Sequence, residues 1–481
     1  MLRSAKKPSQ NLLFRWMFCL SLLAGLSACG NGSSGEPKGR PADAGAQDAG
    51  NDAELATLRS MALEEGLPAP GDPTNALLAD SAKLPLAQAL GHRVFFDKRF
   101  SGPLLDADHK PTVSGALGTP GETGKIACAS CHVPASGFLD SRSPRSALSL
   151  GAGWTPRRAI SLLNVSFGRL FMWDGRHDAL WNQIFTPLEK HFEMNSGRLY
   201  VAQQLARDAT YRQAYEQLFG ALPPVLDVAQ YPQVQEPGCQ SETQGEPSDC
   251  HGKPGDGAEY DQLSAEKKDA VTRVVVNIGK AIQSFERQLR CGPSRFDAWI
   301  NGDETALSAE EQRGARLFVG KAECVRCHSG KFFTDFGFHN VGLEPGGSQE
   351  LFMIPNDPGA SDGVEELQSS TFNATSSFSD DPSVRRFPDS IPPEYIGAFK
   401  TSSLRCASRR TSFLHTAQYV SLDDVVSFKN RGGHASGYAG VSELSPLGLS
   451  DEEQADLVAF LKSLEELPGT GTQEKWLTPP P

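Results

Sequence analysis

Two short strings in the chain place two cysteines and a histidine at the same spacing. They read Cys128-Ala-Ser-Cys131-His132 and Cys324-Val-Arg-Cys327-His328. This spacing is the attachment signature of c-type haem, because two thiols must reach the two vinyl groups of one porphyrin while the next residue places its imidazole under the iron. We therefore expect two covalently bound c haems, one on each string, with His132 and His328 as their iron ligands.

A zinc site or a thioredoxin-like redox pair is the alternative for such strings. A structural zinc ion needs four convergent ligands, whereas the two strings lie almost two hundred residues apart. Four further cysteines follow the leader, namely Cys239, Cys250, Cys291 and Cys406. In an oxidising compartment they are disulfide candidates, the first two closing a local loop and the last two bridging distant segments. Free thiols remain the alternative for both pairs.

The first residues of the chain have the pattern of an export signal. Basic residues precede an apolar run over 17–26, which ends in Leu26-Ser-Ala-Cys29. This pattern is typical of a bacterial lipoprotein signal over 1–28, with Cys29 as the lipid-bearing residue, and an ordinary secretory signal is the alternative. We expect a periplasmic or cell-envelope protein, anchored at the outer membrane. Small and polar residues follow, so 29–75 is predicted to be a flexible tether.

The composition limits the classes of partner. The chain has 481 residues, 39% of them hydrophobic, and a formal net charge of −12. Nucleic acid is excluded, because phosphate binding needs a basic face. The acidity permits docking to a small basic redox protein, although solubility alone would also explain it.

Four segments have the periodicity of helices that could position the two strings. These are 84–96, 267–289, 307–318, which begins with a possible capping box of Ser308 and Glu311, and 450–464. Strand signals are few. The predicted fold class is mostly α, with two cytochrome c-like haem domains in tandem.

The domain boundaries follow from this layout. We place an N-terminal haem domain at 76–265, a C-terminal haem domain at 266–470 and a tail at 471–481. Two insertions, at 222–260 and 343–394, are rich in Pro, Gly, Ser and Asp. They are predicted to be irregular surface loops.

The surroundings of both strings resemble the bacterial di-haem cytochrome c peroxidases, a superfamily that includes the MauG-type enzymes. The resemblance spans about residues 80–465. It is carried by motifs in the same order, among them Phe95-Phe96-Asp97, Trp173-Asp174-Gly175-Arg176, Phe338-His339-Asn340, Phe399-Lys400-Thr401, Leu404-Arg405 and Asn430-Arg431-Gly432-Gly433. It implies that the N-terminal haem meets hydrogen peroxide, and that the C-terminal haem receives electrons from a small cytochrome or cupredoxin. Family members are often dimers.

The resemblance also implies three site residues. Trp173 corresponds to a tryptophan that relays electrons between the haems, and Gln183 and Glu193 to residues that line the peroxide pocket. A carboxylate beside the iron can move a proton between the two peroxide oxygens. An amide can orient the peroxide and stabilise developing charge.

The sequence departs from the family pattern in the residues expected to bind the second iron and in those expected to bind calcium. Neither Ala398 nor Leu414 is the methionine that usually ligates the second iron, so Tyr395, His339 and His415 are the other candidates. At the position where the family often has an asparagine on calcium, this chain has Arg158, which makes calcium doubtful.

Three functions are therefore compared. The first is reduction of hydrogen peroxide, the second is MauG-like oxidation of a partner protein, and the third is electron transfer without catalysis. Gln183 and Glu193 argue against the third, since a carrier needs no proton shuttle. The missing methionine keeps the second open.

A third departure yields a prediction about the resting protein. No His or Met occurs between Val133 and Asn164, where many family members have a histidine that blocks the first haem. We predict that this haem is five-coordinate in the oxidised protein, without reductive activation. Electron paramagnetic resonance should show a high-spin signal for it, and a low-spin resting signal would contradict the prediction.

Overall fold

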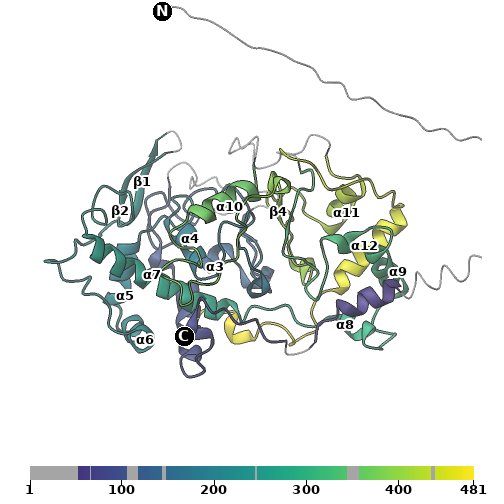
Figure 1. The fold of residues 1–481 in the computed structure, drawn as a ribbon, viewed down its shortest axis with the longest axis horizontal. Helices are drawn as coiled ribbons and strands as arrows, with labels where there is room; N and C mark the ends of the chain where they lie inside the picture. Colours follow the sequence, from purple (N-terminus) through teal and green to yellow (C-terminus); the bar gives the residue numbers. More distant parts are fainter. Residues whose placement is uncertain are drawn as a thin grey trace, which may run out of the picture. The chain divides into compact units, whose positions relative to one another are not determined.

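Helices make up most of the regular structure, with a few short strands, in the residues that the computed structural model describes (Figure 1). Those residues are 53–64, 67–105, 117–143, 148–243, 246–343, 357–434 and 439–480. They all belong to the compact unit that begins at Gly50. The mostly α fold class is confirmed. The expected signal, Cys29 and the first part of the tether lie outside the described residues.

The helices with known bounds are α2 (Leu84–Phe96), α3 (Cys128–Cys131), α4 (Phe185–Glu189), α5 (Arg198–Arg207), α6 (Ala209–Phe219), α7 (Ala265–Glu286), α8 (Arg295–Ile300), α9 (Ala309–Val319), α10 (Ala360–Ser369), α11 (Leu422–Asn430) and α12 (Asp451–Ser463). The strands β1 (Gly238–Thr243) and β2 (Glu246–His251) form one antiparallel pair, and β3 (Phe338–His339) and β4 (Phe399–Lys400) form another. No helix in the described residues is long and apolar enough to cross a membrane.

The helix α7 supports the first haem string from one side. Its apolar stripe is buried, as the sequence pattern predicts, and it packs along α2. A glycine allows the close approach, because a Cβ atom at Gly91 would lie 2.1 Å from the carbonyl oxygen of Ala281. A larger residue at this position would push the two helices apart.

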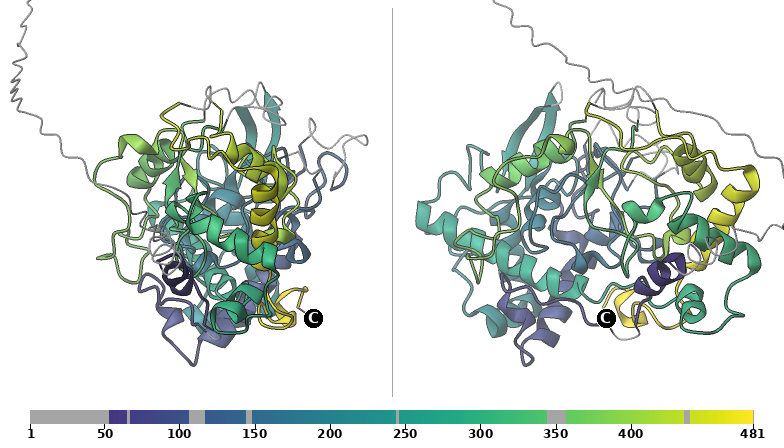
Figure 2. Two further views of the ribbon diagram at one scale, coloured as in Figure 1. Left: turned by 90° about the vertical axis from the view of Figure 1, so that its right-hand side faces the viewer. Right: turned by 45° about the vertical axis from the view of Figure 1, so that its right-hand side comes forward.

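The helices α9 and α12 support the second haem string. They lie side by side (Figure 2, right, α12 in yellow). Each begins with a capping box, of Ser308 with Glu311 and of Ser450 with Glu453, so both helix starts follow from local sequence. The aromatic rings of their shared core are those of Phe296, Phe318, Phe333 and Phe460.

A short helix upstream of α2 joins the same core. Residues 53–60 are helical, and Leu58 and Met61 are 0% and 1% exposed. Both side chains pack in the cluster that contains α9 and α12. The packed part of the chain therefore begins inside the segment that the composition assigns to the tether, because these two apolar residues find a core to cover.

The first insertion is more regular than predicted. Within 222–260, β1 and β2 pair as a hairpin in which Cys239 stands opposite Cys250, and the two form a disulfide. The hairpin is fixed to the rest of the fold by Asn195, whose side chain donates to the carbonyl oxygen of Cys239 and accepts from its N–H, both at 2.8 Å. The prediction of an irregular loop is wrong here, because backbone pairing and the disulfide order the segment.

The second insertion also contains structure that the composition did not indicate. Within 343–394, of which the structure describes residues 343 and 357–394, α10 forms and packs against the core. Its residues Ala360, Val364 and Leu367 are fully buried. They pack in one cluster with Leu170 and Phe338. Their spacing puts them on one helix face, and a segment rich in Pro, Gly and Ser on both sides obscured that pattern.

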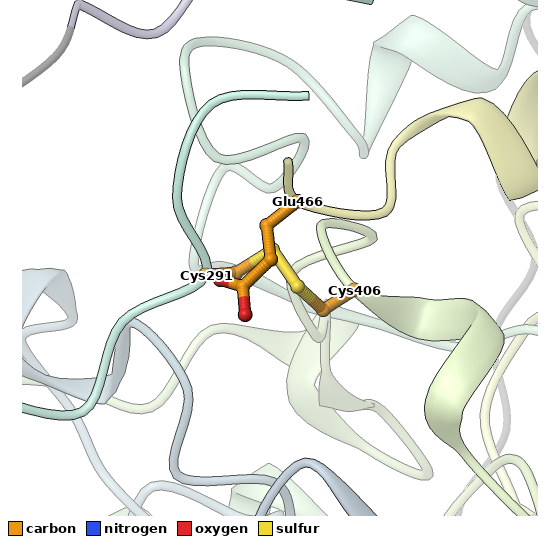
Figure 3. Close-up of side chains that lie close together, drawn as sticks. All are labelled: Cys291, Cys406 and Glu466. Carbon is orange, nitrogen blue, oxygen red and sulfur yellow. A yellow bond between two sulfur atoms is a disulfide. The ribbon is translucent and has the colours of Figure 1, made fainter. Parts of the chain in front are cut away.

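The second disulfide joins distant parts of the chain. Cys291, just after α7, is bonded to Cys406, and Glu466 lies beside them (Figure 3). The Glu466 carboxylate accepts a hydrogen bond from the Gly292 N–H at 2.7 Å and pairs with Arg409 at 2.8 Å. Because the two sulfurs are bonded to each other, this group is a covalent link and not a metal site. Both predicted disulfides are confirmed.

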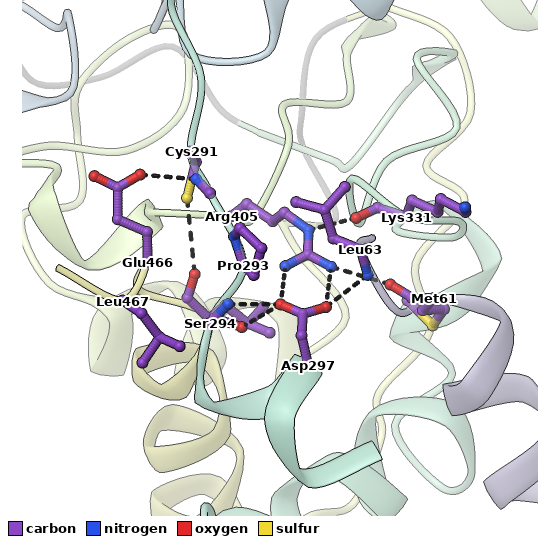
Figure 4. A network of polar contacts seen from close by, with 12 residues as sticks. Met61, Leu63, Cys291, Pro293, Ser294, Asp297, Lys331, Arg405, Glu466 and Leu467 are labelled. Atoms are coloured by element: carbon purple, nitrogen blue, oxygen red, sulfur yellow. Dashed lines mark hydrogen bonds and ion pairs between the residues drawn. The ribbon is translucent and has the colours of Figure 1, made fainter. Parts of the chain in front are cut away.

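A buried ion pair next to this disulfide holds the second haem string in place (Figure 4). The Arg405 guanidinium binds the Asp297 carboxylate at 2.7 and 2.9 Å, and it also donates to the carbonyl oxygens of Met61 and Lys331. The Leu63 N–H donates to the same carboxylate. Burial alone would raise the pKa of Asp297, but Arg405 outweighs it and the pKa is lowered. This pair ties four separate segments together.

We predict that Asp297→Asn lowers the free energy of unfolding by about 3–5 kcal/mol, because it leaves the buried Arg405 charge uncompensated. Chemical denaturation of the full chain measures this. The matched control is Asp269→Asn, which removes the half-exposed partner of Arg273 on α7 and should cost less than about 1 kcal/mol. Equal losses in the two variants would contradict the prediction.

Candidate haem sites

Two cavities lie inside the fold, and each contains one of the Cys-x-x-Cys-His strings. The first cavity, of about 390 Å³, is lined by Cys128, Cys131 and His132. The second, of about 420 Å³, is lined by the string that ends in His328. Each string thus faces an internal space of the kind that a flat, mostly apolar cofactor needs.

The backbone orients both histidines in the same way. Nδ1 of His132 lies 3.1 Å from the carbonyl oxygen of Phe138, and Nδ1 of His328 lies 3.0 Å from that of Phe333. Both phenylalanines have a left-handed backbone, with φ of 57° and 51°. With Nδ1 donating to a carbonyl, Nε2 is the nitrogen that would ligate a metal. Burial lowers the pKa of both imidazoles, to about 4 for His328, so they are neutral, as a ligand must be.

The charges on the cavity walls also suit haem. Burial raises the pKa of the Cys128, Cys131 and Cys324 thiols to about 12, which keeps them protonated until they react. The second cavity is lined by Lys400 and Lys429, and burial lowers the pKa of each to about 8. Buried cations need anionic partners, and the propionates of a haem would supply them. The residues present therefore fit one haem in each cavity.

The predicted peroxide-pocket residues lie in the first cavity. Glu193 and Gln183 both line it, together with His132. Gln183 belongs to the 3₁₀ turn η5 (Asn182–Ile184), which packs on α7. Burial raises the pKa of Glu193 to about 7, although Arg176 and Lys190 oppose the shift. A carboxyl group with this pKa can both accept and return a proton near neutral pH.

The loop that carries Glu193 is held on two sides. A Cβ atom at Gly151 would lie 2.6 Å from the carbonyl oxygen of Glu193, so only glycine allows this approach. Ala152 donates its N–H to the same oxygen at 2.7 Å. Two residues further on, Asn195 binds the carbonyl oxygens of Pro103 and Cys239. The carboxyl group thus projects from a fixed backbone.

Trp173 lies between the two cavities and lines both of them. Its indole N–H donates to the carbonyl oxygen of Arg158 at 2.7 Å, and the Arg158 N–H donates to that of His415 at 2.7 Å. The Arg158 side chain is 2% exposed and also lines both cavities. Among the described residues, Trp173 and Arg158 are the two that line both cavities.

Ion pairs fix the segment that carries Trp173. The next residue, Asp174, is buried and binds the guanidinium groups of Arg157 and Arg176. Arg157 also binds Asp357 at 2.7 Å. Burial opposes ionisation of Asp174, but the two arginines lower its pKa. Gly175 follows with φ of 77°, where the Phe338 ring leaves no room for a Cβ atom.

The candidates for a sixth ligand at the second haem differ in position. Tyr395 is not among the described residues that line the cavity, and its ring packs on Phe338. His339 lines the cavity, but its nitrogens lie 2.8 Å from Asp335 and 2.7 Å from Glu443. His415 also lines the cavity, and its ring stacks on Phe399.

The chain is similar in sequence to known proteins. A family model described as di-haem cytochrome c peroxidase matches residues 85–305. The methylamine utilization protein MauG of Methylorubrum extorquens is 29% identical over 387 residues, which are 80% of this chain and 79% of MauG. Residues 85–305 thus match the di-haem cytochrome c peroxidase family, and the chain is similar to MauG over most of its length.

One further sequence relative and one solved structure are similar to most of the chain. The cytochrome-c peroxidase IdrP1 of Denitromonas iodatirespirans is 27% identical over 404 residues, which are 83% of this chain and 84% of IdrP1. The crystal structure of the diheme peroxidase BthA from Burkholderia thailandensis superposes with a TM-score of 0.56 at 22% identity, covering 81% of this chain and 87% of BthA. This likeness establishes the fold, and the names of the relatives include both peroxidases and MauG.

A further carboxylate, which the sequence pattern had not marked as a site residue, lines the first cavity. Glu286 stands on its wall together with Ile278 and Ile282. The sequence contains a signal for it, because positions 278, 282 and 286 follow one another at four-residue intervals on the apolar face of α7. A carboxylate on that stripe is the exception that points to the cavity.

Proposed function

We propose that this protein reduces hydrogen peroxide to water with electrons from a small redox protein. The observation that carries the proposal is Glu193, with its pKa near 7, in the same cavity as the first haem string. Reduction of one peroxide takes up two electrons and two protons and yields two water molecules. A bound haem would supply the iron that binds peroxide and takes part in the electron transfer.

Three residues of this cavity would carry out proton transfer, peroxide orientation and electron transfer. Glu193 accepts a proton from the peroxide oxygen nearer the iron and returns it to the leaving oxygen. The Gln183 amide orients the peroxide and donates to the oxygen on which charge develops. Trp173, which faces both cavities, carries electrons from the second haem site to the first.

The proposal includes the partners and the location. The electron donor is a small cytochrome or cupredoxin that delivers electrons at the second haem. Cys29 holds a lipid that anchors the protein at the outer membrane, and a homodimer is a further expectation. With Arg158 between the cavities, calcium is not needed, and a chelator should leave the reaction with peroxide unchanged.

MauG-like oxidation of a partner protein is the second candidate. The similarity to MauG over most of the chain and the lack of methionine at Ala398 and Leu414 favour it. Steady-state assays separate the two candidates. Rapid oxidation of a reduced cytochrome or cupredoxin by peroxide supports the first, and peroxide consumption that requires a protein substrate other than a redox donor supports the second.

We predict that Glu193→Gln slows the reaction of the oxidised protein with hydrogen peroxide by about 100-fold or more. Stopped-flow visible spectroscopy measures the rate. Because the group must be deprotonated to accept a proton, the wild-type rate should rise with pH through about 7, and this rise should be absent in the variant. Glu216→Gln, at an exposed position on α6, is the matched control. A variant as fast as the control would rule out the proton shuttle.

A further inference from the structure

A second carboxyl group faces the first haem cavity. Glu286 is the last residue of α7 and is 3% exposed. Its Oε2 atom has no hydrogen-bond partner among the described residues. Burial of a carboxyl oxygen without a partner costs free energy. The position of Glu286 on the cavity wall therefore points to an interaction with the haem that would occupy the cavity.

Glu286 lies on the side of the cavity where Cys128 stands. After burial, the charge of Glu286 is the largest factor that raises the pKa of the Cys128 thiol, ahead of Cys131, and the effect of Glu193 is smaller. For Cys131 the order of the carboxylates differs, with Asp140 and Glu193 as the acidic neighbours. Attachment of haem turns the Cys128 thiol into a thioether, which does not titrate. Glu286 would then be the carboxyl group with the largest electrostatic effect at the position where Cys128 would hold the haem.

Two physical effects keep the Glu286 carboxyl group protonated at neutral pH. Burial raises its pKa to about 8. In addition, the residue stands at the C-terminal end of a helix, where the aligned peptide dipoles disfavour a negative charge. A group so close to its titration point responds to a change in charge nearby.

In the described structure, no charged group on a neighbouring element forms an ion pair with the Glu286 carboxyl group. Arg157 and Arg176 bind Asp174. The loop with Glu193 contributes Lys190 on the same cavity wall, and the segment before η4 (Val165–Phe167) contributes Arg158. None of them forms an ion pair with Glu286.

The groups on α2 and beyond α7 are directed elsewhere. On α2, His92 binds the carbonyl oxygen of Thr478 at 2.8 Å, and burial lowers its pKa, so it is neutral. Beyond the end of α7, Arg287 and Arg290 donate to the carbonyl oxygens of Ala69 and Leu67. On this side of the cavity, Glu286 is therefore the titratable group that can gain or lose a proton when the charge of the haem site changes.

We propose that Glu286 couples a proton to the oxidation state of the first haem, which rests on the proposed function only in that the first cavity holds a haem. Of the two electrons that one peroxide molecule takes up, one comes from this site and the other from the second haem. When the site gives up its electron, Glu286 releases one proton to solvent and its carboxylate balances the added positive charge. When the donor returns the electron, Glu286 takes up one proton. Glu286 acts through charge and not by touching peroxide, so it is a positioning residue that favours the oxidised site.

The reduction potential of the first haem tests this coupling directly. Spectroelectrochemical titration of the full, haem-loaded chain at several pH values between 6 and 9 gives that potential independently of turnover. In the wild type the potential should fall as pH rises. In Glu286→Gln the part of this fall that lies around pH 8 should be lost, because no carboxylate forms at position 286, while the part due to Glu193, which titrates near pH 7, remains.

Three variants make the outcome specific. Glu266→Gln, an exposed change of the same kind on α7, should behave like the wild type. Glu193→Gln should lose the fast peroxide reaction but keep the fall in potential due to Glu286. Glu286→Asp keeps a carboxyl group and should keep the pH dependence with a shifted midpoint, which guards against a folding defect of the glutamine variant.

The result that would overturn the inference is a Glu286→Gln protein with both haems bound and the same potential as the wild type at every pH. Failure of the proposed function would give a different result. The protein would then bind haem and its potential would still depend on pH, but the oxidised protein would not react with peroxide.

Discussion

The position of one indole ring, between two haem-sized cavities, is the constraint on which the account depends. Trp173 reaches both spaces because its N–H is bound to the carbonyl oxygen of Arg158, and because Asp174, next in the chain, is clamped by two arginines. If this segment moved, the two cavities would lose their common wall. Much of the remaining structure serves to keep the walls of each cavity fixed around it.

The interior of the molecule contains buried carboxyl groups in two kinds of surroundings. Where a carboxylate only supports the fold, an arginine lies against it, as with Asp297 and Arg405, and its pKa is lowered. Where a carboxyl group faces the first cavity, burial dominates, and the pKa values of Glu193 and Glu286 are raised to about 7 and 8. These two carboxyl groups, which titrate near neutral pH, thus both face the space where protons would be exchanged.

The sequence predicted the parts of the site that depend on short spacing. The two haem strings, the helices around them and both disulfides could be read from residue types and periodicity. The cavity positions of Gln183, Glu193 and Trp173 came from the resemblance and not from composition. Glu286 was missed because a carboxylate at the end of an apolar stripe fits a solvated helix end as well as a cavity wall. The structure decides between the two, because Glu286 is buried and lines the first cavity.

The ordered insertions could not be predicted for a different reason. The hairpin of β1 and β2 depends on a contact with Asn195, which lies more than forty residues earlier in the chain. The helix α10 depends on a surface formed by Leu170 and Phe338. Such contacts between distant segments leave no periodic signal in the sequence, so composition alone favoured loops.

Electron transfer between the two haem sites tests the central role of Trp173 most directly. In the half-reduced protein, in which the second haem is ferrous and the first is oxidised, peroxide is added and the oxidation of the second haem is followed by stopped-flow absorbance. If Trp173 carries the electrons, Trp173→Phe slows this step strongly while the first haem still reacts with peroxide at the wild-type rate. Oxidation of the second haem at an unchanged rate in this variant would contradict it.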